Sequence, residues 1–321
     1  MMPKNILLAM ALILVSVKTS AQAMGGVGSG GIGISYSLQP ERKFKSTPGG
    51  YKYTAFGMNA RIPLFRKNNL ATGHFFETSL QADLQAASAN FGFVASTRKF
   101  TNGSLGLGAV IFNGGKNMYI INAAVGIAAD NDVISKTNTR YRFSGAFIVN
   151  HQHSNTTLYQ YGMIFTYSFG KPLPLPVLGI RTKLSSNWTF STILPVELSF
   201  TNRINTKLGL SFNIRPAGNR YQFDNQANFS TVSSTVFMQM REFQLGAALN
   251  YKLSRSFSLG ADAGFLIGGK LRFTEQDDIN KTVFETTAKP GANFRLSLRY
   301  RLPRKMEGAN KLQEILNPLG N

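Results

Sequence analysis

The sequence predicts an all-β protein, a transmembrane antiparallel β-barrel of about 12 strands, within a range of roughly 10 to 14. Three observations predict it: segments that alternate apolar and polar residues, an N-terminal export signal, and no long apolar stretch after that signal. The clearest alternation runs from Ala292 to Leu302. One face carries Ala292, Phe294, Leu296, Leu298, Tyr300 and Leu302, and the other carries Asn293, Arg295, Ser297, Arg299 and Arg301. Because successive side chains of a strand point to opposite faces, an apolar wall is backed here by a basic one.

The N-terminus has the features of a secretory signal peptide. Lys4 supplies a positive charge, Ile6 to Val17 form a short apolar region, and Ala21-Gln22-Ala23 is a cleavage site of the A-x-A type. About 12 apolar residues are too few to span a bilayer, which needs roughly 20. We therefore expect a signal peptide over residues 1–23, a barrel over residues 24–302 and a C-terminal periplasmic tail over residues 303–321.

The same alternation recurs in segments of about ten residues, the length that a tilted membrane strand needs. It is clearest in residues 75–85, 158–169, 207–215 and 257–274. In the last of these segments, the alternation assigns Leu271 and Phe273 to the lipid-facing side. It assigns Lys270 and Arg272 to the lumen.

Small polar clusters between these segments indicate tight hairpin turns. We place four of them on the periplasmic side, at residues 99–106, 183–188, 202–209 and 252–260. Three longer polar stretches, residues 129–138, 151–156 and 275–282, are expected to face outward from the cell.

Two places interrupt the alternation. Residues 172–176 contain three prolines, which lack the backbone donor of a strand, so we expect an extended linker at the barrel rim. At Arg241-Glu242 the apolar positions change parity, because Met238 and Met240 are assigned outward and are followed by Phe243. A β-bulge or a turn is expected there.

Composition narrows the functional classes. The chain has 35 Lys and Arg against 15 Asp and Glu, and no Cys, which excludes disulfides and thiolate metal sites. The basic residues lie on polar strand faces and at strand ends rather than in one compact patch, so we expect no nucleic-acid partner. The predicted location is the cell outer membrane. The expected partners there are membrane lipid, lipopolysaccharide and, during biogenesis, the barrel-assembly machinery.

The lumen is the best candidate for a functional site, because inward positions carry many more basic than acidic side chains. The charged candidates are Arg295, Arg299, Arg301, Asp262, Lys270, Arg272, Arg215 and Glu197. An unpaired charge in a narrow lumen is costly, so we expect Asp262 to pair with Arg295 or Arg299 on the next strand. The remaining positive charge favours anions, which indicates a porin-like passive channel for small polar or anionic solutes. The alternative is a closed structural or interaction barrel whose lumen is filled and which acts through its loops or its tail.

Other motifs carry less chemistry. Residues 28–33 match G-x-G-x-x-G, but a strand follows them where a dinucleotide site needs a helix. His151 and His153 share one strand face beside aromatic residues, which favours a place in the interfacial aromatic belt over a metal site. A lipid-modifying barrel enzyme using His74 or these histidines is a weaker alternative. We expect neither an enzyme nor a bound cofactor.

Several longer segments resemble a known family. They include Pro172-Leu173-Pro174-Leu175-Pro176, Arg220-Tyr221-Gln222-Phe223, residues 242–251 and residues 261–273. Together they resemble a family of outer-membrane β-barrel proteins that is defined only as a domain of unknown function and is frequent in the Bacteroidota. The similarity covers most of the mature chain and is strongest from about residue 172 to residue 301. The resemblance implies a barrel in the outer membrane and no catalytic residues.

Overall fold

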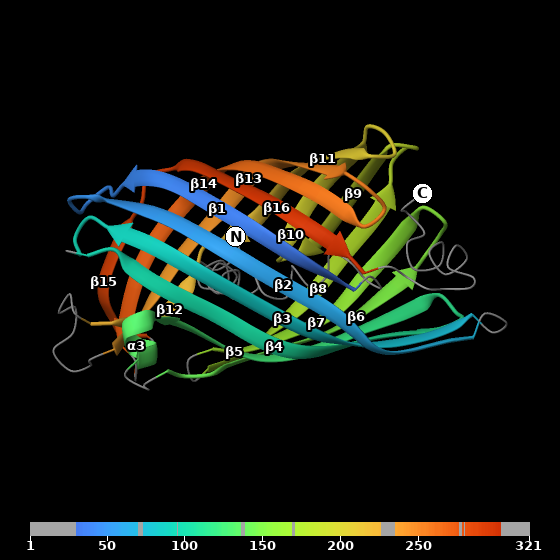
Figure 1. Ribbon diagram of the computed structural model, residues 1–321, viewed down its shortest axis with the longest axis horizontal. Coiled ribbons are helices and arrows are strands. Elements are labelled where there is room, and N and C mark those ends of the chain that lie inside the picture. Colours follow the sequence, from blue (N-terminus) through green and yellow to red (C-terminus); the bar gives the residue numbers. More distant parts are fainter. Residues whose placement is uncertain are drawn as a thin grey trace, which may run out of the picture.

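The chain forms one antiparallel sheet that closes on itself as a barrel (Figure 1). The computed structural model describes residues 30–69, 73–94, 96–135, 139–168, 171–225, 235–275, 278 and 280–302. Its strands are β1 (Gly31–Lys43), β2 (Gly50–Asn69), β3 (His74–Phe91), β4 (Arg98–Asn113), β5 (Asn117–Asp130), β6 (Arg142–Gln152), β7 (Thr157–Ser168), β8 (Lys171–Lys183), β9 (Trp188–Leu194), β10 (Glu197–Arg203), β11 (Leu208–Ala217), β12 (Arg220–Asp224), β13 (Thr235–Lys252), β14 (Phe257–Glu275), β15 (Thr282–Thr287) and β16 (Gly291–Arg301). A short helix, α3 (Asn131–Ser135), follows β5. The predicted signal peptide and C-terminal tail lie outside the described residues.

Fourteen of the described strands make the ring. Strands β1 to β11 follow one another, β13, β14 and β16 complete the wall, and β16 pairs with β1 from Gly31↔Arg301 to Leu38↔Phe294. The ring therefore has two strands more than the expected 12. The sequence-based estimate allowed each strand too many residues, because β9 and β10 have only seven residues each and the turns beside them are short.

The turns at residues 153–156, 184–187, 204–207 and 253–256 lie at one end of the barrel, which we call the turn end, whereas the two-residue turn between β9 and β10 lies toward the other end. The turns at residues 184–187, 204–207 and 253–256 are where the sequence predicts them. In each, an early Ser or Asn side chain accepts backbone N–H groups two and three residues further on; the Asn205 Oδ1 atom, for example, accepts both bonds at 2.8 Å. Such side chains close tight turns because they replace a backbone acceptor.

Two predictions about connections are wrong. Residues 151–156 are not a long outward loop, because a turn at residues 153–156 joins β6 and β7 at the turn end. Residues 99–106 are not a turn, because they lie within β4 and pair with β3 and β5. Their small polar side chains resemble a turn in sequence but occupy a strand, where Asn102 faces the lumen.

The proline-rich segment is a strand rather than a linker. Pro172, Pro174 and Pro176 belong to β8 and pair with β7 in continuous register. On the other side of β8, pairing with β9 begins only at Leu178. The prolines therefore stand where the second neighbour is missing, so their absent N–H groups leave no gap in a ladder.

The expected bulge is present, but the extra residue is on β14. The register shifts between Arg241↔Lys270 and Phe243↔Ile267, and Gly268 has a φ of 69°. Met238 and Met240 are therefore not lipid-facing; both are fully buried on the inner side. The bulge also reverses the parity of β14, because a bulge inserts one extra residue into the alternation.

The outer wall is apolar. Large side chains that are 40% to 60% exposed lie on the outside of strands around the ring, among them Phe56, Leu107, Phe147, Phe212 and Leu296. Exposed Tyr159, Trp188 and Tyr251 stand at strand termini near the turn end. No helix among the described residues is long and apolar enough to cross a membrane.

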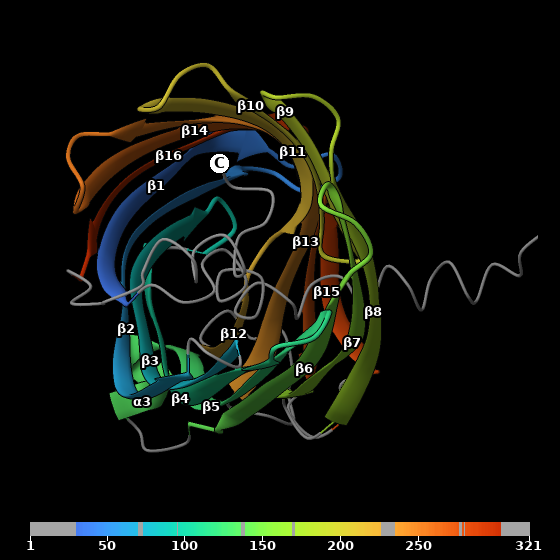
Figure 2. The same cartoon turned by 90° about the vertical axis from the view of Figure 1, so that its right-hand side faces the viewer.

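The opposite end, which we call the loop end, is closed by a strand inside the ring. β12 pairs with the loop-end half of β13 from Arg220↔Gln239 to Asp224↔Thr235, and its Gln222 bridges to Ala129 of β5. β5 and β13 are the fifth and twelfth of the 14 ring strands, so they are seven strands apart in either direction. β12 therefore joins opposite walls, as the view along the barrel shows (Figure 2).

Aromatic side chains pack around β12 and form what we call the plug. The hydroxyls of Tyr221 and Tyr53 are hydrogen-bonded to each other at 3.0 Å. The ring centroids of Tyr221 and Phe100 are 4.5 Å apart. Phe223 meets Phe273 edge to face at 5.2 Å. The four plug residues Tyr221, Phe223, Phe100 and Phe273 are at most 1% exposed. Close packing of this kind excludes water and holds the inner strand against the wall.

Two buried ion pairs join strands of the wall beside the plug, and one of them also contacts β12. Arg42 donates to Glu242 at 2.8 Å, and both side chains are buried. Arg98 pairs with Asp130 at 2.7 Å, stacks over Phe223 at 4.8 Å and donates to the Asp224 carbonyl. Removing one partner of such a pair leaves an uncompensated buried charge.

We expect the substitution Glu242→Gln to destabilise the barrel by about 3–5 kcal/mol, because Arg42 would lose its buried partner. The matched control is Glu285→Gln, since Glu285 pairs with Lys270 at 2.8 Å in an exposed position and should contribute less than about 1 kcal/mol. The measurement is urea-induced unfolding of the refolded barrel in detergent, followed by gel mobility without heating. Equal unfolding midpoints for the two variants would contradict this account of the plug.

Candidate functional site: the basic lumen cavity

The lumen between the plug and the turn end is a cavity of about 980 Å³. Its closed end is lined by Tyr53, Arg142 and Tyr221, and its open end by turn residues such as Asn187 and Asn205. The deeper aromatic residues of the plug do not line it. Within the described residues the cavity is therefore blind, because it opens at the turn end and stops at β12.

Basic side chains dominate the lining. Among the described residues that line the cavity, twelve are basic and three are acidic. The basic ones are Arg61, Arg142, Arg181, Lys183, Arg203, Lys207, Arg215, Arg220, Lys252, Arg295, Arg299 and Arg301. The acidic ones are Asp83, Glu197 and Asp262. The excess of basic side chains makes this cavity electropositive.

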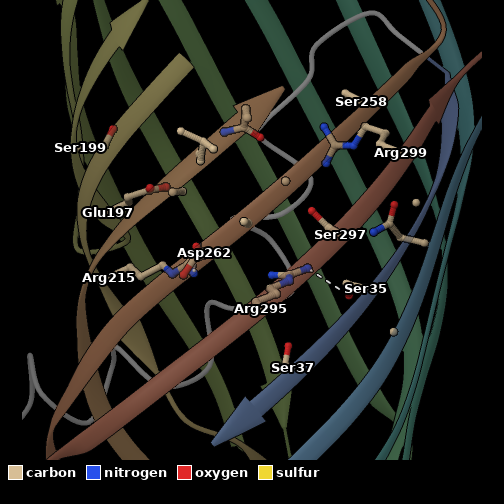
Figure 3. A pocket seen from close by; sticks show the side chains of 18 of the residues that line it. Ser35, Ser37, Glu197, Ser199, Arg215, Ser258, Asp262, Arg295, Ser297 and Arg299 are labelled. Carbon is tan, nitrogen blue, oxygen red and sulfur yellow. Dashed lines mark hydrogen bonds and ion pairs between the residues drawn. The ribbon is translucent and has the colours of Figure 1, made fainter. Parts of the chain in front are cut away.

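One of the three acids is already neutralised. Asp262 accepts a 2.8 Å bond from Arg215 on β11 and a 2.7 Å bond from the Gln244 amide on β13. Asp262 and Arg295 are register partners, but the ion pair goes to Arg215, so the predicted pairing with Arg295 or Arg299 is wrong. Glu197, at the start of β10, faces the same cavity next to Arg215 of β11 (Figure 3).

Within the described part of the chain, Arg295 and Arg299 of β16 form no ion pair with a carboxylate, although Asp262 lies opposite Arg295 and acts on its charge. The shortest contact of Arg295 is a long 3.4 Å hydrogen bond to the Ser35 hydroxyl on β1. Arg299 has no hydrogen bond or ion pair with any residue that the structure describes. Both side chains point into the cavity, and Ser297 stands between them on the same strand face (Figure 3). The set offers guanidinium and hydroxyl donors, and the carboxylate beside it, Asp262, is already bonded to Arg215 and Gln244.

A second group of arginines lies at the closed end. Arg142 of β6 and Arg220 of β12 line the cavity there, near Arg241. Burial, together with the charges of Arg142 and Arg241, lowers the pKa of Arg220 to about 9. Arg220 nevertheless remains cationic at neutral pH, so the closed end of the cavity is positive as well.

Six of the eight predicted site residues line the cavity: Arg295, Arg299, Arg301, Asp262, Arg215 and Glu197. Lys270 and Arg272 do not. They lie beyond the bulge of β14, where Lys270 pairs with Glu285 and Arg272 donates to Thr282 and to the carbonyl of Asn280. Their assignment to the lumen is wrong because the bulge reverses the faces, and Leu271 and Phe273 are buried inside instead.

Arg142 and Arg220 were not among the predicted site residues. The sequence does signal Arg142, which has the opposite parity to the exposed Tyr141 and Phe143. For Arg220 the sequence gives no comparable signal, because nothing in the alternation shows that β12 lies inside the ring.

The three histidines lie away from this cavity. His74 begins β3, and the Nδ1 atom of His151 is 2.7 Å from the Asn117 side-chain oxygen. The His153 ring is tilted against the Tyr159 ring, with the ring centroids 5.1 Å apart. Among the described residues, no group of three or more histidines and carboxylates is placed to hold a metal ion.

A closed antiparallel barrel with an apolar outer wall and a polar lumen defines the class: the fold is that of outer-membrane β-barrels. The particular family follows from the sequence. Residues 18–302 match the model of a domain of unknown function, DUF6268, and the chain belongs to that family. No curated protein sequence matches the chain.

Solved barrels of similar size resemble the structure. They include an outer-membrane channel from Pseudomonas putida F1, with 12% identity, a TM-score of 0.41, and coverage of 85% of this chain and 94% of that one. The translocator domain of the autotransporter NalP from Neisseria meningitidis has 9% identity, a TM-score of 0.40, and coverage of 89% and 93%. The toluene transporter TodX from P. putida has 8% identity, a TM-score of 0.38, and coverage of 91% and 94%. Similarity at this level carries no information about function.

We expect a cysteine placed at Ser297 to react faster with a negatively charged methanethiosulfonate than with a positively charged one. The positive cavity concentrates the anionic reagent and repels the cationic one. The chain has no native Cys, so the label is unique. A cysteine at Ser254, in an exposed turn, gives the reference ratio of the two rates. Equal ratios at the two positions would contradict an electropositive cavity.

Proposed function

We propose that this protein is an outer-membrane β-barrel whose lumen is a blind chamber for small anionic solutes, opening at the turn end on the periplasmic side. The observation that carries the proposal is β12, which joins opposite walls and closes the lumen beside a basic cavity. An open porin-like channel, favoured by the sequence alone, requires a continuous path that the plug interrupts. The closed alternative is therefore the better one, with binding as its activity.

Two features support placement in an outer membrane. Every ring strand has two neighbours over much of its length, so the backbone groups are paired within the sheet, as a bilayer requires. The exposed apolar outer wall, with Tyr and Trp near one end, matches the lipid band and the interfacial belt of membrane barrels. Lipid and lipopolysaccharide are the partners proposed for this wall, and the barrel-assembly machinery is the one proposed for its insertion.

A gated channel is the second candidate. It is favoured by the limited attachment of β12, which has five pairs with β13 and a single bridge to β5. Displacing one five-residue strand would connect the cavity to the loop end. We propose binding or conduction rather than catalysis, because the cavity offers charge and hydroxyl donors while the histidines lie elsewhere.

The first test is conductance of the refolded protein in a planar bilayer. We expect the native barrel to be silent, and the double variant Tyr221→Ala with Phe223→Ala to show stable open steps with an anion-leaning reversal potential. The reason is that both rings are buried in the plug, whereas the basic cavity remains. The matched control, Phe212→Ala on the exposed outer face, should stay silent.

Large stable steps from the native barrel would contradict the blind chamber and favour an open porin. Silence from the double variant, with folding shown by heat-modifiable gel mobility, would show that the plug does not depend on these rings. Steps that flicker in the native barrel and become stable in the variant would favour the gated channel.

The second test concerns location. The native protein expressed with its N-terminus intact should sediment with outer-membrane fractions in a sucrose gradient and lose residues 1–23, because the export signal directs it there. The mature N-terminus is read by mass spectrometry. Recovery from the inner membrane or the cytoplasm with an intact N-terminus would contradict the proposed placement.

A further inference from the structure

We infer that the cavity binds a phosphate-bearing anion between Arg295 and Arg299 of β16. The inference deepens the proposed function, on which it rests, because it names the ligand chemistry and the residues of the same chamber. It starts from one contrast within the cavity. Arg215 forms the ion pair with Asp262, whereas Arg295, which lies opposite Asp262, and Arg299 form no ion pair with a carboxylate among the described residues.

The spacing of the two arginines suits one small anion. They are four residues apart on one strand face, which places their Cα atoms roughly 13 Å apart. Ser297 lies midway, and the two side chains project into the cavity on either side of it (Figure 3). Arginine side chains are long, so the two guanidinium groups can approach each other above Ser297. The space left between them suits a compact group with more than one negative charge.

The floor between the arginines is built from small polar residues. On β1, Ser35 is paired with Ser297 and Gly33 with Arg299; on β14, Ser258 is paired with Arg299 and Gly260 with Ser297. A side chain at Gly260 would meet the Ser297 hydroxyl at 2.5 Å, and one at Gly33 would meet the Asn59 amide at 2.7 Å. The glycines therefore leave no side chain over this part of the wall, and the half-buried hydroxyls of Ser35, Ser258 and Ser297 line the cavity.

Charge decides between the classes of anion. A phosphate group carries nearly two negative charges at neutral pH and offers several acceptor oxygens, whereas a single carboxylate carries one charge. Two guanidiniums that form no ion pair with a described carboxylate, together with nearby hydroxyls, match the former, because each guanidinium presents a planar fork of donors. The surrounding surplus of basic residues, including Arg301 and Lys252 near the mouth, adds attraction of the same sign.

The test is calorimetric titration of the refolded barrel in detergent with inorganic pyrophosphate, in 0.1 M salt to screen contacts at the outer surface. Glucose 6-phosphate is titrated in parallel to distinguish a free phosphate from a phosphorylated sugar, and citrate serves as a carboxylate of comparable charge. We expect one site for the phosphate ligands, and tighter binding of at least one of them than of citrate.

The double variant Arg295→Gln with Arg299→Gln should weaken phosphate binding about a hundredfold, or about tenfold for each lost charge-assisted interaction. The matched control is Arg272→Gln, because Arg272 lies on β14 outside the cavity and should leave binding unchanged. Heat-modifiable gel mobility shows that each variant is folded.

Unchanged pyrophosphate affinity in the double variant would overturn the site, and equal affinity for citrate would overturn the phosphate class. Failure of the proposed function looks different. Open conductance of the native barrel would contradict the blind chamber, but it would not change the phosphate affinity measured in detergent. Failure of the proposed function and failure of the phosphate site can therefore be told apart.

Discussion

The pairing of β16 with β1 is the constraint on which the rest of the structure depends. In a bilayer every exposed backbone group needs an internal partner, so a sheet is stable there only when it has no edge. Eight paired positions from Gly31↔Arg301 to Leu38↔Phe294 supply that closure. Once the ring is closed, each strand has one face on the outer wall and one toward the lumen, and the alternation in the sequence separates an apolar outer surface from a polar inner one.

Closure also explains how β12 can lie inside. An inner strand has backbone groups of its own to satisfy, and β12 pairs with the part of β13 that β11 does not reach. β13 is therefore completed by two different neighbours, β11 toward the turn end and β12 toward the loop end. The inner face of this half is covered by aromatic rings instead of water, which removes the polar lumen there.

The sequence predicts the two faces of a strand well wherever the alternation is unbroken. Residues 292–302, 207–215 and 75–85 all have their polar sides in the cavity or buried on the inner side. The prediction of strand faces fails where one extra residue shifts the alternation. The bulge at Gly268 exchanges the faces of Lys270 and Leu271, and no local signal marks it because a glycine pair is equally compatible with a regular strand.

The inner strand is the other failure, and its cause is different. Arg220-Tyr221-Gln222-Phe223 alternates as an ordinary wall strand does, so its pattern holds no information about which side of the ring it occupies. Its position depends on contacts with Tyr53, Phe100 and Phe273, which are far away in the chain. Only the three-dimensional arrangement shows that the lumen is divided.

This division also separates the charges. Acids near the loop end, such as Glu242 and Asp130, are held in buried pairs with Arg42 and Arg98. They are therefore unable to neutralise the cavity on the other side of the plug, where three acids face twelve basic residues. The loop-end carboxylates are thus held in buried ion pairs beside the plug, and the cavity on its other side keeps a positive excess. Because β12 separates these two groups of charges, the electropositive character of the cavity depends on the position of β12 as well as on the arginines of the wall.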